Sequence, residues 1–62
     1  MTVREFILRY SLDTFCIVTF ENWSVSILYD SRKTKYDVPM MLSDSLVESV
    51  NVKHNGMVEI EI

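Results

Sequence analysis

Cysteine, histidine, glycine and proline are scarce in this chain of 62 residues, which contains one of each. A single cysteine excludes an intramolecular disulfide, and because small secreted domains usually carry several, we expect a cytoplasmic protein. One cysteine and one histidine are too few for the usual four-ligand zinc site, and one glycine excludes a glycine-rich phosphate loop. We therefore expect neither a metal nor a cofactor.

Long apolar runs are also lacking. The longest unbroken one, residues 15–18, is far shorter than the roughly 20 residues that a membrane helix needs. Arg4 and Glu5 stand where a signal peptide would need apolar residues, so we expect neither a signal peptide nor membrane contact.

Apolar content is nevertheless high: 48% of the residues are hydrophobic and the net charge is only −3. This composition predicts a folded chain with a single small domain, 1–62, rather than a disordered one. So small a domain, lacking a disulfide or a metal, is marginally stable alone and gains from a partner or a second copy.

The first segment has the pattern of a capped helix. Thr2 and Glu5 have the spacing of a capping box. The residues that follow place one apolar stripe on a helical face, made of Val3, Phe6, Ile7 and Tyr10. We predict a helix over residues 2–10, which is too short to persist unless it packs against something.

Two runs rich in β-branched and aromatic residues, 14–20 and 24–29, flank a short break at residues 21–23 and predict a β-hairpin. Simple alternation defines one face that we expect to be the core, consisting of Cys16, Val18, Phe20, Val25, Ile27 and Tyr29. The opposite face is half apolar and consists of Phe15, Ile17, Thr19, Ser26 and Leu28.

A polar, basic segment, residues 30–37, leads to a short apolar stretch. Asp37 is a candidate cap for a helical turn with Pro39 in its first turn. Met40 and Met41 are expected mainly to fill gaps in the core, although methionines also form adaptable contact surfaces.

A second hairpin is predicted at the C-terminal end, where Val50 and Val52 precede Val58 and Ile60 at alternating positions. A two-residue turn at residues 55–56 would oppose Val52 to Glu59. A three-residue loop, 54–56, opposes Val52 to Val58 and places Gly56 in the left-handed position of its turn. We predict the three-residue loop.

Together these elements predict an α+β fold. It consists of an antiparallel sheet of about four strands, built from two hairpins, with the N-terminal helix packed on one face and a short helical turn between the hairpins.

Catalytic chemistry finds little support in this pattern. His54, the one histidine, is expected in an exposed turn, and Cys16 is expected to behave as a small buried hydrophobe. The acidic residues are expected to cap helices or to solubilise the surface, including Asp37, Asp44, Glu59 and Glu61. We expect no enzyme and name no catalytic residue.

The predicted architecture leaves one sheet face without cover, because a single short helix can cover only the other. Exposed apolar faces and sheet edges mark sites for a partner. The predicted interface consists of Phe15, Ile17 and Leu28 on that face, Trp23 at the hairpin tip, and the basic residues Arg32, Lys33 and Lys35. For Trp23 an interface and a structural role both stay open, as do a solvated loop and an anion contact for the basic cluster.

Two end motifs carry a resemblance. The chain opens with Thr-Val-Arg-Glu-Phe, Thr2 to Phe6, and closes with a V-x-x-V-x-V…N-G-x-V-x-I-x-I hairpin, Val47 to Ile62. In these segments, about half of the chain, it resembles small uncharacterised proteins encoded by phages, prophages and mobile elements of Firmicutes. The resemblance implies an accessory role in a bacterial cytoplasm and no catalytic residue.

Three functions are compatible with these patterns. The leading hypothesis is a non-enzymatic protein-binding module that occupies a surface, for example one that inhibits a host defence protein as anti-CRISPR proteins do. The alternative is a structural homo-oligomer, with a homodimer as its simplest form. A nucleic-acid-associated regulator using Arg32, Lys33 and Lys35 is less favoured, because the chain is acidic with a pI near 4.8.

Overall fold

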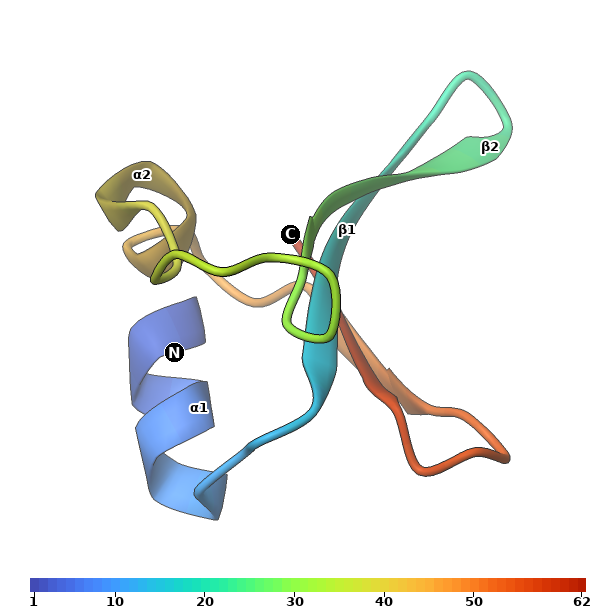
Figure 1. Ribbon diagram of the computed structural model, residues 1–62. Helices are drawn as coiled ribbons and strands as arrows, with labels where there is room; N and C mark the ends of the chain where they lie inside the picture. Colours follow the sequence, from blue (N-terminus) through green and yellow to red (C-terminus); the bar gives the residue numbers. More distant parts are fainter.

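The computed structural model describes residues 1–62 and contains two helices and one four-stranded sheet. The elements follow in the order α1 (Val3–Tyr10), β1 (Phe15–Glu21), β2 (Ser24–Asp30), α2 (Met40–Ser43), β3 (Ser49–Val52) and β4 (Val58–Glu61) (Figure 1). The predicted α+β fold, with an N-terminal helix and two hairpins separated by a short helix, is confirmed.

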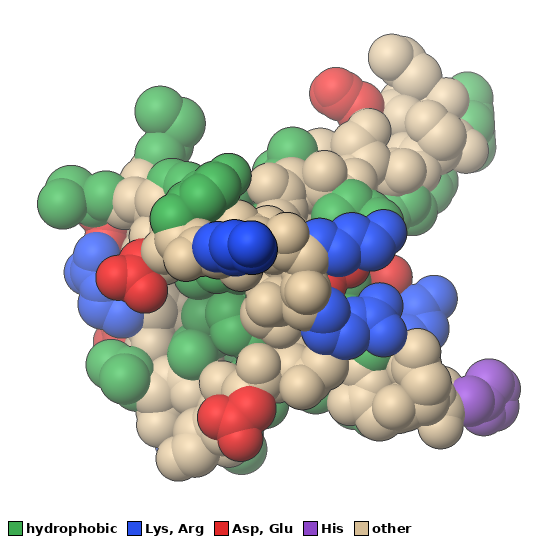
Figure 2. Space-filling view, viewed as in Figure 1, with side chains coloured by type: hydrophobic (Ala, Val, Ile, Leu, Met, Phe, Trp, Pro, Cys, Tyr) green, Lys and Arg blue, Asp and Glu red, His purple; other side chains and the backbone are tan.

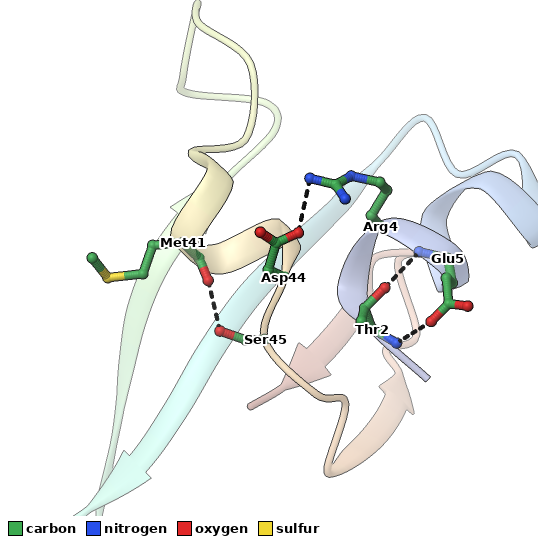
Figure 3. A network of polar contacts seen from close by, with 6 residues as sticks. All are labelled: Thr2, Arg4, Glu5, Met41, Asp44 and Ser45. Atoms are coloured by element: carbon green, nitrogen blue, oxygen red, sulfur yellow. Dashed lines mark hydrogen bonds and ion pairs between the residues drawn. The ribbon is translucent and has the colours of Figure 1, made fainter.

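Helix α1 begins with the predicted capping box. The backbone N–H of Glu5 donates to the Thr2 hydroxyl at 3.2 Å, and the Thr2 N–H donates to the Glu5 carboxylate at 2.8 Å (Figure 3). These two bonds satisfy N–H groups that have no partner within the helix. At the other end Ser11 adopts a left-handed conformation, and its N–H donates back into the last turn, which ends the helix.

The two helices are tied together by charge as well as by packing. Arg4 on α1 forms an ion pair with Asp44, directly after α2, at 2.9 Å (Figure 3). Both side chains are about half exposed, so solvent screens this pair and its contribution to stability is modest. The segment after α2 is also joined to the start of α1 by the backbone N–H of Val3, which donates to the Ser45 carbonyl at 2.9 Å.

The sheet joins the hairpins through a parallel pair of strands. Its order is β2-β1-β4-β3, and β1 runs parallel to β4, with Ile17 opposite Ile60. The sheet is therefore mixed, and the prediction of an entirely antiparallel sheet is wrong for this pair of strands. The segment between the hairpins, residues 31–48, carries the chain from one edge of the sheet to the other, and this crossover leaves β1 and β4 adjacent and parallel.

The main core lies between α1 and the sheet. Its buried members are Val3, Phe15, Ile17, Tyr29 and Ile60. The helix therefore covers the face that carries Phe15 and Ile17, and the prediction that these two residues lie on the uncovered face is wrong. On the opposite face only Cys16, Val18 and Met57 form a small buried cluster.

A β-bulge in β2 explains part of this reversal. Ile17 pairs with Tyr29 but the next residue, Val18, pairs with Ile27, so Leu28 is an extra residue without a partner of its own. One extra residue reverses the alternation of the strand. Tyr29 therefore lies with Phe15 and Ile17 under the helix, and not with Ile27 as simple alternation predicts.

The C-terminal hairpin has the predicted register. Val52 lies opposite Val58 and Val50 opposite Ile60, with Gly56 in a left-handed conformation at φ 83°. The side-chain oxygen of Asn55 accepts the N–H of Met57 at 3.0 Å, which further fixes the loop. The three-residue loop at 54–56 is confirmed.

Helix α2 differs from the expectation in two ways. Its N-cap position is Pro39, which has no side-chain donor or acceptor, so Asp37 is not its cap. Met40 and Met41 are exposed rather than core residues, because this single turn directs Leu42 and Ser43 inward instead.

The capping box predicts a pH-dependent contribution from Glu5. The N–H of Thr2 donates to its carboxylate and holds the pKa of Glu5 below its ordinary value of 4.5. A lowered pKa in the folded state stabilises the fold above about pH 4.5, and this contribution is lost as the pH falls through the lowered pKa. In urea unfolding across a pH series, Glu5→Gln should be less stable than the parent protein at neutral pH and equal to it at the acidic end. A difference that stays constant with pH, or that Glu48→Gln reproduces, would contradict this assignment.

The bulge predicts a contrast between two changes at one position. Deleting Leu28 should prevent folding, because Tyr29 and Ile27 could no longer both keep their present faces. Leu28→Ala keeps the extra residue and removes a side chain that is 43% exposed, so it should cost about 1 kcal/mol or less of unfolding free energy. Circular dichroism with urea unfolding measures both. A folded deletion variant would show that the bulge is dispensable.

Candidate functional site

The outer half of the first hairpin extends away from the body of the molecule (Figure 1). Strand β4 pairs with β1 only over residues 15–18, so the rest of β1 has β2 as its single neighbour in the sheet. The outer pairs are Thr19 with Ser26, Phe20 with Val25 and Glu21 with Ser24. We call this two-stranded projection, residues 19–27, the arm.

The arm carries apolar side chains that nothing in the molecule covers. Phe20, Val25 and Ile27 lie on the face opposite α1, because Val25 pairs with Phe20 and Ile27 pairs with the inward-lying Val18. Their exposed fractions are 53%, 51% and 62%, and that of Trp23 at the tip is 94%. Figure 2 shows hydrophobic side chains along this projection. We call these four residues the arm patch.

Trp23 lies in a turn whose backbone conformation is unfavourable for a bulky residue. Asn22 and Trp23 both have positive φ, at 52° and 65°, so the two strands are joined by a two-residue turn of the mirror-image type that matches strand twist. Asparagine tolerates this conformation, but a bulky residue at the second position is an outlier where glycine is preferred. The left-handed conformation costs an ordinary L-residue roughly 1–2 kcal/mol. The chain therefore displays its one tryptophan at a local energetic cost.

The predicted interface residues do not form one surface. Trp23 and Leu28 are exposed as expected. Phe15 and Ile17 are buried under α1 and offer nothing to a partner of the folded monomer. The helix covers one face of the sheet, as expected, but this is the face that simple alternation predicts to be uncovered.

The basic residues lie at the opposite end of β2 from Trp23. Arg32, Lys33 and Lys35 are exposed in the loop that follows the strand. Arg32 is engaged with Asp30, whose carboxylate lies 3.6 Å from the guanidinium and also accepts the Arg32 backbone N–H. The basic cluster is therefore separate from the arm patch, and one of its three charges is partly neutralised.

Cys16 is buried among Val18 and Met57, as predicted for a small hydrophobe. Burial raises the pKa of its thiol, and the nearby carboxylates of Glu59 and Asp30 raise it further. The thiol is therefore neutral near pH 7 and a poor nucleophile.

The remaining candidate groups also have structural surroundings. His54 is exposed in the loop between β3 and β4, as predicted. Glu59 lies 3.7 Å from the Lys53 ammonium, and Glu61 accepts the hydroxyl of Ser49 at 2.7 Å. No three side chains among His, Cys, Asp and Glu converge in the geometry of a metal site.

A shallow groove between α1 and the second hairpin is a feature that sequence reasoning missed. Its volume is about 330 Å³ and its lining is entirely apolar, made of Phe6, Tyr10, Leu12, Val50, Val52 and Val58. It forms because α1 packs over β1 and β4 but leaves the edge strand β3 uncovered. The sequence does contain a signal for this groove, because one short helix is too small to cover a whole face of a four-stranded sheet.

The turn geometry predicts that Trp23→Gly stabilises the protein. Glycine adopts positive φ without strain and creates the Asn-Gly pair that this turn prefers, so the unfolding free energy should rise by about 1 kcal/mol. Trp23→Ala is the matched control, because it removes the same ring but keeps the strained conformation. Urea unfolding should place the glycine variant above both other proteins. Equal stability of the glycine and alanine variants would show that the turn is not strained.

Comparison with known proteins adds no assignment: no family model matches the chain, and no curated protein or solved structure is significantly similar to it. Neither helix is long and apolar enough to cross a membrane.

Proposed function

We propose that this protein is a non-enzymatic protein-binding module and that it binds its partner through the arm patch. The proposal rests on Trp23, whose side chain is 94% exposed and whose backbone has a left-handed conformation that is unfavourable for a bulky residue. Backbone strain kept at an exposed aromatic residue points to a function for that residue. Tryptophan is also among the residues most enriched at binding hot spots.

The composition of the arm patch favours a protein partner with an apolar surface. Phe20, Val25 and Ile27 provide aliphatic and aromatic area on one face of the hairpin whose turn contains Trp23, with no charged side chain among them. Such a centre, depleted of charge and rich in aromatic residues, is typical of protein interfaces. The nearest charge on the arm is Glu21, at the edge next to the turn.

Nucleic acid is the less favoured partner. Affinity for phosphates depends on clustered positive charge, and this chain has a net charge of −3. Its basic residues lie at the far end of β2 from Trp23, and Arg32 is paired with Asp30. A regulator bound to nucleic acid through this loop would leave the arm patch without a role.

The biological setting of the proposal is that of an accessory protein of a phage or mobile element, acting in the bacterial cytoplasm. Its support is the resemblance carried by Thr2 to Phe6 and by Val47 to Ile62. In that setting the protein would occupy a surface of a host protein, with inhibition of a defence protein as one form. Such a role needs a small rigid domain with an exposed anchor, and the arm supplies one.

The proposal predicts which variants lose the partner. Tagged protein incubated with a Firmicute lysate should retain one stoichiometric partner, identified by mass spectrometry. Trp23→Gly and Ile27→Thr should lose it, because each removes apolar area from the arm patch while the turn or strand is preserved. Met41→Ala is the matched control, since it removes an apolar side chain that is 83% exposed on α2, and α2 lies on the other side of the molecule from the tip of the first hairpin (Figure 1).

Two results would contradict the proposal. Retention of the partner by Trp23→Gly would move the binding surface away from the arm. Recovery of the bait alone by the parent protein would favour the structural homo-oligomer.

A further inference from the structure

Strand β2 is an edge strand without the usual protection against pairing. It lies at one end of the sheet, and from Ser24 to Tyr29 it contains no charged residue and no proline. Natural edge strands are commonly shortened or guarded by charges, because their free N–H and C=O groups can pair with another strand. The opposite edge, β3, follows this rule: it has four residues and lies between Glu48 and Lys53.

The turn determines which backbone groups of β2 are free. In a hairpin closed by a two-residue turn, the two residues that flank the turn form backbone hydrogen bonds with each other. Away from the turn, pairs without mutual hydrogen bonds then alternate with hydrogen-bonded pairs. Ser24 and Ser26 therefore direct their backbone groups to Glu21 and Thr19 on β1. The N–H and C=O groups of Val25 and Ile27 point outward, away from the sheet.

We propose that two copies of this chain pair through β2, antiparallel, about a two-fold axis at Ser26. In this register Val25 of one copy lies opposite Ile27 of the partner subunit, and each exchanges both backbone hydrogen bonds with the other. The outward N–H and C=O groups of Val25 and Ile27 in both copies then all have hydrogen-bond partners. The two four-stranded sheets become one continuous sheet.

The side chains suit a second copy. On the face opposite α1, Val25 and Ile27 form two aliphatic cross-strand pairs, and on the other face the two Ser26 residues meet at the axis. Asp30, the nearest charge along β2, lies beyond Leu28, so its two copies are at opposite ends of the paired segment and no like charges oppose each other. The bulge at Leu28 lies at the end of the paired segment and leaves its centre regular.

A symmetric disulfide tests the register. Residues opposite each other without mutual hydrogen bonds have Cα atoms about 4.5 Å apart, within the range that a disulfide spans. Ser26→Cys should therefore form a covalent dimer rapidly in oxidised glutathione. Ser24→Cys is the matched control: it is equally exposed on the same strand, but its two copies would lie about 14 Å apart and should not crosslink. The native Cys16 is buried in both variants.

Sedimentation equilibrium of the unmodified protein and of Ser26→Lys provides the second test. The unmodified protein should be a dimer, and two lysines facing each other at the axis should weaken dimerisation by about tenfold or more. High salt should partly restore it, because it screens the repulsion. Since Ser26 is exposed in the monomer, the variant should unfold at the same urea concentration, measured below its dimerisation range.

A monomeric parent protein, equal crosslinking of both cysteine variants, or a dimer unaffected by Ser26→Lys would overturn the proposal. A dimer that resists Ser26→Lys would indicate another surface, such as the groove beside α1. The inference stands apart from the proposed function, because Trp23→Gly changes the arm patch but keeps the pairing groups of Val25 and Ile27. A Trp23→Gly protein that dimerises yet retains no partner would support both.

Discussion

The rest of the structure depends on the parallel pairing of β1 with β4. Ile17 and Ile60 lie opposite each other in these strands, both with no exposed surface, and Val3 of α1 is buried in the same cluster. This contact joins the two hairpins into one sheet and fixes the face on which the helix packs. Because β4 ends at Glu61, opposite Val18, it also determines where the support of β1 ends and where the arm begins.

Features set by neighbouring residues in the chain could be predicted from the sequence, and features set by distant pairing could not. The capping box of Thr2 and Glu5 and the three-residue loop ending at Gly56 depend on local spacing, and both are confirmed. The parallel pairing joins residues more than forty positions apart, and nothing local encodes it. The bulge at Leu28 was hidden for another reason: residues on both faces of the first hairpin are apolar, so the pattern fits either alternation.

The same ambiguity explains the mixed outcome for the candidate site. The helix covers one face, as expected, but the covered face is that of Phe15 and Ile17. Three residues that simple alternation predicts to be core, Phe20, Val25 and Ile27, are therefore exposed on the opposite face. The exposure of Trp23 could be predicted because a hairpin tip is exposed whichever face of the sheet is buried.

The arm can bind a partner through its face and pair with a second copy through its edge at the same time, because the two contacts use different chemical groups. Strand pairing consumes backbone N–H and C=O groups in the plane of the sheet, whereas Phe20, Val25 and Ile27 project out of that plane. Pairing about Ser26 would leave the arm patches uncovered and bring two of them together on one face. The dimer would then offer a partner a doubled apolar surface with a tryptophan near each end. A two-fold symmetric partner could engage both copies, and the second contact would form at high effective concentration, so binding would be stronger than one arm allows.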